Sequence, residues 1–167
     1  LPSGAVIDLA GPDPQSWTDE DLAIGLSRTF RWGGHSGWPH PLSVAQHSLS
    51  VLAIRQADEA ALEPGEALFE LLHDAEEGLL GFDCIAPLKA FLGSPFATLC
   101  QKLTAAIAAR YQLPEMRPEQ YRRHKIADTV AAASEALHVA RWTPGDIRSV
   151  LKIATAPLMC DPLETGP

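Results

Sequence analysis

His73 and Asp74 follow two leucines in the segment Leu71-Leu72-His73-Asp74-Ala75-Glu76-Glu77. The surrounding pattern predicts an apolar helix from about Pro64 to Leu80, and burying an unpaired imidazole and carboxylate there would cost several kcal/mol. A divalent metal ion would compensate, because neutral imidazole and carboxylate are both common ligands. Neighbouring helical residues lie about 100° apart, so both side chains could reach one ion. The pair therefore predicts a metal site.

Glu77 lies four residues after His73 and three after Asp74, on the same face of that predicted helix. A carboxyl group beside a metal site could act as an acid or base, although Glu77 could instead form a salt bridge with a lysine. Glu76 is two residues from Asp74, so we expect it on the far side, in solvent.

Two more candidate ligands lie on other predicted helices. His47 is one turn into a helix expected from Ser43 to about Gln56, 26 residues before His73. Asp128 lies 54 residues after Asp74, in the middle of a helix expected from Pro118 to about Val139. The alanines at 131–133 give this helix a smooth surface. Taken alone, His47 would be an ordinary histidine and Asp128 a surface or cap residue.

A loop expected from Arg31 to Leu42 is rich in glycine and proline but also holds polar and aromatic side chains, which is typical of functional loops. The guanidinium fork of Arg31 suits phosphate, although the residue could simply be solvated. Trp32 could contact a ligand or fill the core. His35 and His40 could contact substrate or stabilise the loop.

Length and composition favour a single globular domain. The chain has 167 residues, 46% hydrophobic and 20% charged, with a formal net charge of −8. This charge disfavours binding of a nucleic acid polymer. There is no apolar run of about 20 residues and no leader pattern at the start, so we expect a cytoplasmic protein without a membrane segment. The cysteines at 84, 100 and 160 do not have the spacing of metal ligands, so we expect them to be reduced thiols. We expect Cys84 to be a small side chain that fills space in the packing.

The elements that must position these residues are predicted from caps and periodicity. We expect helices at about 18–30, 43–56, 64–80, 94–111 and 118–139, and a short one after Thr143. Residues 1–17 read as an extended arm, 81–87 as a break and 157–167 as a loose tail. The fold class is therefore all-α, with about six helices in one compact domain.

The ordered set of these motifs resembles the HD superfamily of metal-dependent phosphohydrolases. The similarity runs from about Ile7 to Leu137 and is strongest to the small branch of bacterial 5′-deoxynucleotidases and phage dATP triphosphohydrolases. It rests on Arg31-Trp32, Ser43–Ser48, His73–Glu77, Ala86–Lys89 and Ala127-Asp128. The family usually places an Asp five residues after the catalytic Glu, whereas Asp83 comes six residues after Glu77.

The resemblance implies a site in an HD-type helical domain. One divalent cation, which could be Mn, Co, Fe, Ni, Zn or Mg, would be bound by His47, His73, Asp74 and Asp128. Glu77 and Arg31 would be the catalytic residues. Contacts to a small nucleotide would come from Arg31, Trp32, His35, Asp83 and Lys89. The family also leads us to expect a homo-oligomer, a dimer or higher.

The expected reaction is hydrolysis of deoxyribonucleoside 5′-monophosphates to nucleoside and phosphate, and three alternatives stay open. A deoxynucleoside triphosphate triphosphohydrolase would need further cations, for which Lys89 and the basic run 122–125 are candidates, although that run reads first as a solvated helix face. An HD-type di-iron oxygenase needs extra histidines, and only His124 lies between Asp74 and Asp128. The third alternative is a non-catalytic nucleotide sensor.

Overall fold

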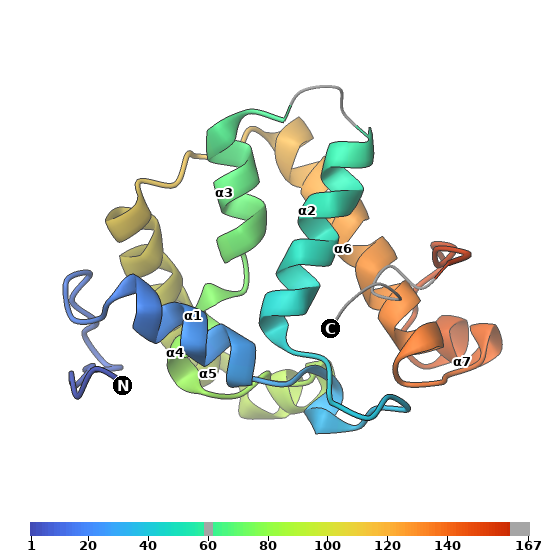
Figure 1. The fold of residues 1–167 in the computed structure, drawn as a ribbon, viewed down its shortest axis with the longest axis horizontal. Helices are drawn as coiled ribbons and strands as arrows, with labels where there is room; N and C mark the ends of the chain where they lie inside the picture. Colours follow the sequence, from blue (N-terminus) through green and yellow to red (C-terminus); the bar gives the residue numbers. More distant parts are fainter. Residues whose placement is uncertain (59–61, 161–167) are drawn as a thin grey trace.

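A computed structural model describes residues 1–58 and 62–160, and in this part of the chain it confirms an all-α fold in one domain (Figure 1). Seven α-helices and one short 3₁₀ helix follow each other along the described residues. They are α1 (Asp19–Arg28), η1 (Arg31–Gly34), α2 (Val44–Asp58), α3 (Pro64–Leu72), α4 (Ala75–Leu80), α5 (Ala86–Tyr111), α6 (Pro118–His138) and α7 (Pro144–Ser149).

The predicted helix caps are present where the sequence placed them. Thr18 Oγ1 accepts a hydrogen bond from the backbone N–H of Asp21 at 3.0 Å. In return, the Asp21 carboxylate accepts one from the backbone N–H of Thr18 at 2.9 Å. Ser43 and Gln46 make the same reciprocal pair before α2. α6 begins at Pro118, as expected. These starts are local features, because each depends on residues no more than three positions apart.

The helix predicted from 64 to 80 is two helices, so this prediction was wrong. α3 ends at Leu72 and α4 begins at Ala75, with Asp74 outside helical geometry at φ −113° and ψ 24°. The physical reason lies at the backbone carbonyl of Glu70, which accepts a hydrogen bond from His73 Nδ1 at 2.7 Å. In a continuous helix this oxygen would accept from the N–H of residue 74. His73 and Asp74 therefore lie on a turn.

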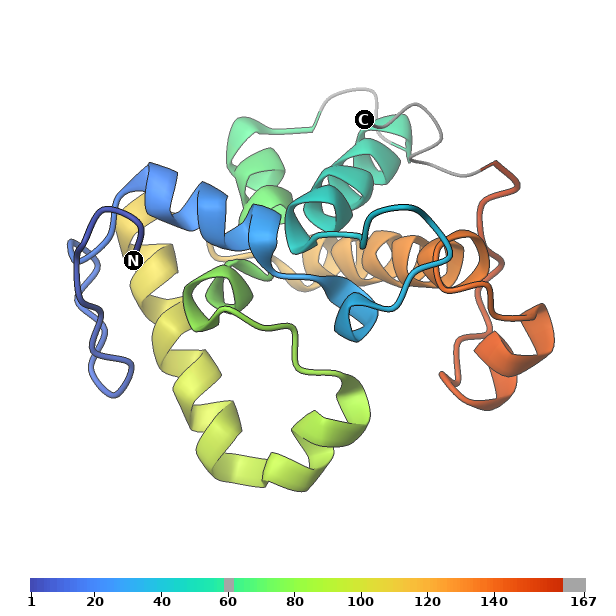
Figure 2. The ribbon, with the colours of Figure 1, turned by 60° about the horizontal axis from the view of Figure 1, so that its bottom comes forward.

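α5 begins at Ala86, eight residues before the predicted start at Ser94. It bends at Gly93, which has φ 66° and ψ −150°, a conformation open mainly to glycine. The predicted Ser94-Pro95 start therefore marks only the second part of the helix. Figure 2 shows the first part of α5 turned away from the second.

The largest core cluster joins α1, α2, α4 and α5 with Trp17, which lies two residues before α1. It contains Trp17, Leu22, Leu26, Val44, Ala75, Leu79, Leu103, Ala106 and Ile107. Within it, α1 and α4 cross at Gly25 and Gly78. A Cβ atom added to Gly25 would lie 2.3 Å from the carbonyl oxygen of Gly78, so the two backbones are in direct contact. This contact fixes the position of α4 and of Glu77, which precedes Gly78.

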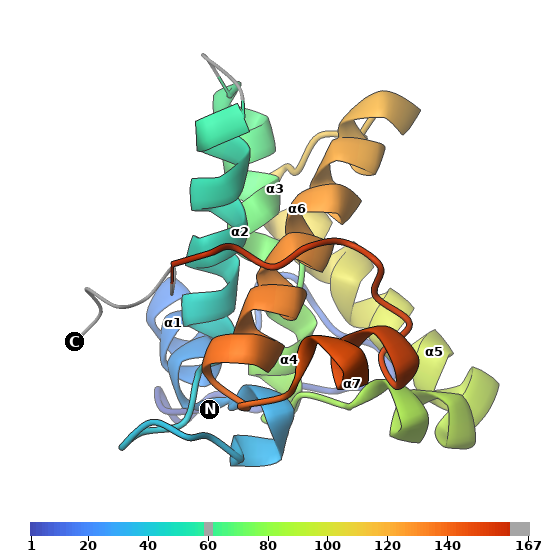
Figure 3. The ribbon, with the colours of Figure 1, turned by 90° about the vertical axis from the view of Figure 1, so that its right-hand side faces the viewer.

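α2 and α6 lie side by side (Figure 3). Val51 of α2 packs against Ala127 and Ala131 of α6, which confirms that the small side chains let the helices approach. The apolar residues of α2 predict that Leu49 shares the buried face with Val44 and Val51, but Leu49 is 55% exposed and this prediction is wrong. The close approach of the two helices brings His47 and Asp128 together.

The predicted extended arm at residues 1–17 and the predicted loose tail from residue 157 agree with the structure to different degrees. Residues 1–17 contain no helix, as predicted, and Ile7 and Leu9 pack against the core. The tail was expected to be loose from 157. However, the backbone N–H of Leu158 donates to Ser134 Oγ (2.9 Å), and its carbonyl oxygen is 3.0 Å from His138 Nε2. Leu158 is thus tied to α6, and 161–167 lie outside the described residues. No described helix has both the length and the apolar character needed to cross a membrane.

Candidate functional site

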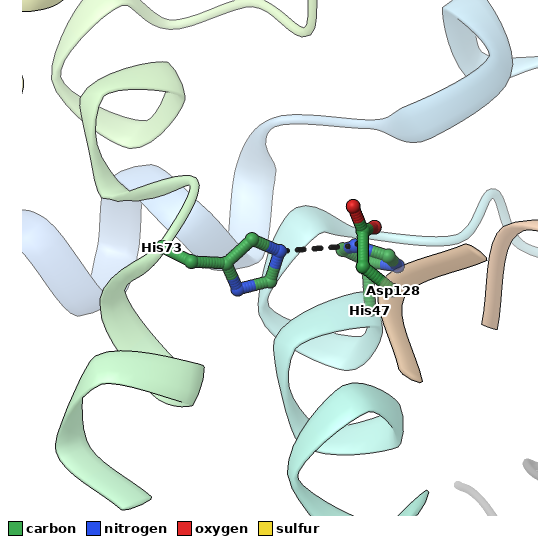
Figure 4. A group of neighbouring side chains, drawn as sticks. All are labelled: His47, His73 and Asp128. Carbon is green, nitrogen blue, oxygen red and sulfur yellow. Dashed lines mark hydrogen bonds and ion pairs between the residues drawn. The ribbon is translucent and has the colours of Figure 1, made fainter. Parts of the chain in front are cut away.

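Three of the predicted ligands converge from three elements (Figure 4). His47 comes from the first turn of α2, His73 from the end of α3 and Asp128 from the middle of α6. His47 Nε2 is 3.3 Å from His73 Nε2 and 3.3 Å from Asp128 Oδ1. One ligand atom from each residue lies within 4.8 Å of the other two. These three side chains could hold a metal ion.

Asp74, the fourth predicted ligand, adjoins the same point. Its Oδ2 is 3.3 Å from His73 Nε2 and 3.6 Å from His47 Nε2. The turn between α3 and α4 brings this carboxylate to the histidines, in place of the continuous helix that the sequence suggested. Two imidazoles and two carboxylates form a mixed nitrogen and oxygen donor set that suits several divalent metals.

Hydrogen bonds orient both imidazoles toward this point. His47 Nδ1 is 2.6 Å from Glu135 Oε1, and His73 Nδ1 is 2.7 Å from the Glu70 carbonyl oxygen. Because a carboxylate and a carbonyl are acceptors, each Nδ1 is the donor, and in a neutral imidazole Nε2 then carries a lone pair. Two lone pairs 3.3 Å apart repel unless a proton or a cation lies between them. The donor set therefore fits a bound metal ion.

The charges around the site favour a cation at the same place. Burial alone would lower the pKa of His73, but the Asp74 carboxylate raises it to about 9. Burial would raise the pKa of Asp74, yet the neighbouring His73, His47 and Arg31 hold it well below its usual range. The pKa of Asp128 is also lowered against burial, by hydrogen bonds with His47 and Lys125. Positive charge between the histidines is thus strongly stabilised.

Glu77 is 3% exposed and has one free oxygen. Its Oε1 accepts a hydrogen bond from Lys89 Nζ at 3.1 Å, so the salt bridge considered for this residue is present. Its Oε2 is buried without a hydrogen-bond partner among the described residues. Burial and the charges of Asp74 and Asp83 raise the pKa of Glu77 to about 8, against the opposing charge of Lys89. A buried carboxyl group with a raised pKa is typical of acid–base residues.

Glu76 was expected in solvent, and this was wrong. The side chain is half-buried and its Oε2 is buried without a hydrogen-bond partner in the described part of the chain. Burial, followed by the charge of Asp74, raises its pKa to about 7. The turn at Asp74 is the reason, because it sets α4 on a new axis and removes the helical register on which the expectation rested.

Arg31 and Trp32 lie beside the candidate metal ligands. Arg31 Nε donates to Glu135 Oε2 at 2.8 Å, and Arg31 Nη1 is 3.7 Å from Asp74 Oδ2. Trp32 Nε1 donates to the same Glu135 oxygen at 3.3 Å. The Trp32 ring also packs against Trp142, with centroids 5.9 Å apart, and against the cluster that contains Ile147. Trp32 therefore has both a core contact and a contact with the site.

Two glutamates near the histidines were missed from the sequence. Glu135 is 1% exposed and contacts His47, Arg31 and Trp32. Burial alone would raise its pKa, but the charges of Arg31 and His47 hold it at about 2. The spacing could have revealed it, because Glu135 follows Asp128 by seven residues and so lies on the same side of α6. Glu70 was missed as well, although a glutamate three residues before His73 is on the same helix face.

The remaining predicted substrate contacts divide into two groups. Lys89 reaches Glu77, and the negative charge of Asp83 acts on Glu77 and Arg31, so both lie near the site despite the extra residue before Asp83. His35 is exposed, and the structure gives it no polar side-chain contact with the site within the described residues. Cys84 is buried, and burial raises the pKa of its thiol, as befits a filler.

The basic run at 122–125 is only partly the solvated face that was expected. Arg122 and Arg123 are exposed and pair with Glu119. His124 is buried instead, with Nδ1 2.6 Å from Glu70 Oε2 and its ring 4.9 Å from that of His73. Lys125 forms an ion pair with Asp128. The helical period explains the difference, since four consecutive residues span more than one turn and His124 is the one that points inward while the other three face solvent.

Comparison with known proteins gives a relative without an assigned activity. No family model matches the sequence. The chain is 38% identical over 145 residues to an uncharacterized protein of Rhodobacter capsulatus, an alignment that covers 86% of this chain and 74% of that protein. At this identity and coverage, the chain belongs to the same family as that protein. The described part of the present chain is all-α and holds a candidate metal centre.

Proposed function

We propose that this protein is an HD-type, metal-dependent phosphohydrolase that cleaves deoxyribonucleoside 5′-monophosphates into nucleoside and phosphate. The observation that carries the proposal is the convergence of His47, His73 and Asp128, with Asp74 beside them and both Nε2 lone pairs directed to one point. The ordered motifs that resemble the HD superfamily support the same assignment. The ion would be Mn, Co, Fe, Ni, Zn or Mg, since the donor set suits all of them.

The surrounding residues have complementary roles in this reaction. A divalent ion, when bound, polarises phosphate oxygens and lowers the pKa of water. Glu77, through its free Oε2, accepts a proton from the attacking water or delivers one to the leaving 5′-oxygen. Arg31 has five guanidinium donors, and those not engaged by Glu135 can stabilise charge that grows on the phosphate.

Trp32 carries the proposed preference for a deoxyribose. It follows Arg31 directly, so if Arg31 contacts the phosphate, the indole is placed to crowd the adjoining sugar. A ring there would disfavour a 2′-hydroxyl by a steric penalty. Lys89 is the candidate for a contact to further phosphates, because its side chain is 46% exposed next to Glu77. A triphosphohydrolase is therefore the alternative that the experiment must separate.

The test is product analysis with metal-stripped protein and one added metal at a time. dAMP, AMP and dATP are incubated with each of the six metals, and free phosphate and nucleoside are quantified by malachite green and chromatography. Phosphate and deoxyadenosine from dAMP would support the proposal. Deoxyadenosine and triphosphate from dATP, with dAMP inert, would replace it by the alternative. No product from any substrate with any metal would refute it.

A further inference from the structure

A single buried carboxylate connects the candidate metal ligand His47 with the pair Arg31-Trp32. Glu135 uses Oε1 for His47 Nδ1 (2.6 Å) and Oε2 for Arg31 Nε (2.8 Å) and Trp32 Nε1 (3.3 Å). The residue is 1% exposed, so water does not compete for these contacts. Both carboxylate oxygens are engaged, and each serves a different part of the site.

The backbone at Trp32 needs such a restraint. Trp32 has φ 58° and ψ 24°, in the left-handed region that is rare for residues other than glycine. Gly33 and Gly34 follow with positive φ as well. Strained conformations of this kind persist only where surrounding contacts determine them. Here the contacts are the indole hydrogen bond to Glu135 and the packing of the ring on Trp142.

We propose that Glu135 is a positioning residue that couples the metal ligand His47 to the Arg31-Trp32 turn, so that metal binding at His47 alters the hydrogen bonds of this turn before a nucleotide arrives. The inference rests on the proposed function for the roles of the metal and of Arg31. It goes beyond that function because it concerns Glu135, a residue that contacts neither phosphate nor metal. Glu135 links His47 to the Arg31-Trp32 turn.

The physical link is the shared carboxylate. When His47 Nε2 donates its lone pair to a cation, its Nδ1–H becomes a stronger donor and its bond to Glu135 Oε1 strengthens. Because hydrogen bonds that share a group polarise one another, the change at Oε1 reaches the bonds at Oε2. The indole N–H of Trp32 is one of those bonds. This N–H should therefore report metal binding at His47 although it is not itself a ligand.

The first experiment follows the indole N–H signals of the full chain by nitrogen–proton NMR during a titration with Mg²⁺ or Zn²⁺, without nucleotide. Replacement of Trp32 by Phe assigns its signal. We expect the Trp32 signal to shift with metal occupancy, while that of Trp17, which lies in the core cluster of α1, stays in place. A Trp32 signal that does not move when the metal is fully bound would overturn the proposal.

The second experiment measures metal affinity by calorimetry in two matched variants. Glu135→Gln keeps the shape but turns one acceptor into a donor facing another donor, and we expect metal affinity to fall by about 10–100-fold, the usual effect of losing such a partner. Glu66→Gln removes another buried carboxylate, whose Oε1 lies 3.7 Å from Arg55 Nη2. This variant should keep the metal affinity within about threefold of the wild type. Equal loss in both variants would overturn the proposal.

The two tests do not depend on each other or on turnover. If Glu135→Gln does not fold, the titration of the wild-type protein still decides the matter. A metal-dependent shift of the Trp32 signal in a protein without phosphohydrolase activity would support this inference and count against the proposed function. Failure of the wild-type protein to bind any metal would overturn both.

Discussion

Replacing Gly25 by Ala tests the contact that sets α4 and Glu77 in place. The new Cβ atom would lie 2.3 Å from the carbonyl oxygen of Gly78 and 2.9 Å from its carbonyl carbon. An ordinary carbon–oxygen contact is about 3.3–3.6 Å. Both obstructing atoms are backbone and cannot rotate away, so α1 and α4 must separate by about 1 Å, judged against that contact distance.

The expected cost follows from two opposing effects. Overpacking of this kind costs about 1–3 kcal/mol, and a clash between backbones belongs at the upper end. Alanine recovers about 1 kcal/mol over glycine within a helix. The net loss of unfolding free energy is therefore about 2 kcal/mol. In a chain of this size, this loss lowers the melting temperature by about 4–8 °C.

Thermal unfolding followed by circular dichroism, with metal-free protein, measures the effect. Gly145→Ala in α7 is the matched control, because the nearest atom to its added Cβ would be Thr143 Oγ1 at an ordinary 3.5 Å. The control should melt at the wild-type temperature or slightly above it. A melting temperature of Gly25→Ala equal to or above that of the wild type would refute the reasoning from close backbone contact.

Three further substitutions test the site. Asp74→Ala should remove metal, measured by mass spectrometry, and the rise in melting temperature that metal gives the wild type; full metal content with normal turnover would reject Asp74 as a ligand. Glu77→Gln should keep the metal while kcat drops by about 10²–10⁴-fold, and a rate within a few-fold of wild type would leave Glu77 a structural role. Trp32→Ala should raise kcat/KM for AMP relative to dAMP, whereas a lower melting temperature with an unchanged ratio would assign the ring to the core alone.

The helix boundaries that sequence reasoning predicted well are those set by neighbouring residues. The caps at Thr18 and Ser43 form within three residues, so their patterns are readable without knowledge of the fold. The break at His73-Asp74 was not predicted because periodicity records polarity and not a bond from a side chain to a backbone carbonyl. The early start of α5 was missed because a glycine bend inside one helix resembles a boundary between two.

The same distinction holds for the candidate site. The convergence of His47, His73, Asp74 and Asp128 was predicted from the resemblance of their order to the HD superfamily, because His47 and Asp128 taken alone carry no such signal. The spacing from Asp128 places Glu135 on the right side of α6, but it does not identify the partners Arg31 and His47, which lie 104 and 88 residues away in the sequence. Only the packing of α6 against α2 and the 31–42 loop brings them within reach.

Asp128 and Glu135 lie about two turns apart on α6, and this arrangement limits which changes in chain length the family can accept. One residue inserted between them would rotate Glu135 by about 100° around the helix, away from His47. The same insertion at residues 112–117, between α5 and α6, would add only to a connection. We therefore expect gaps in an alignment of relatives to collect in such connections, while the interval of seven residues from Asp128 to Glu135 stays constant.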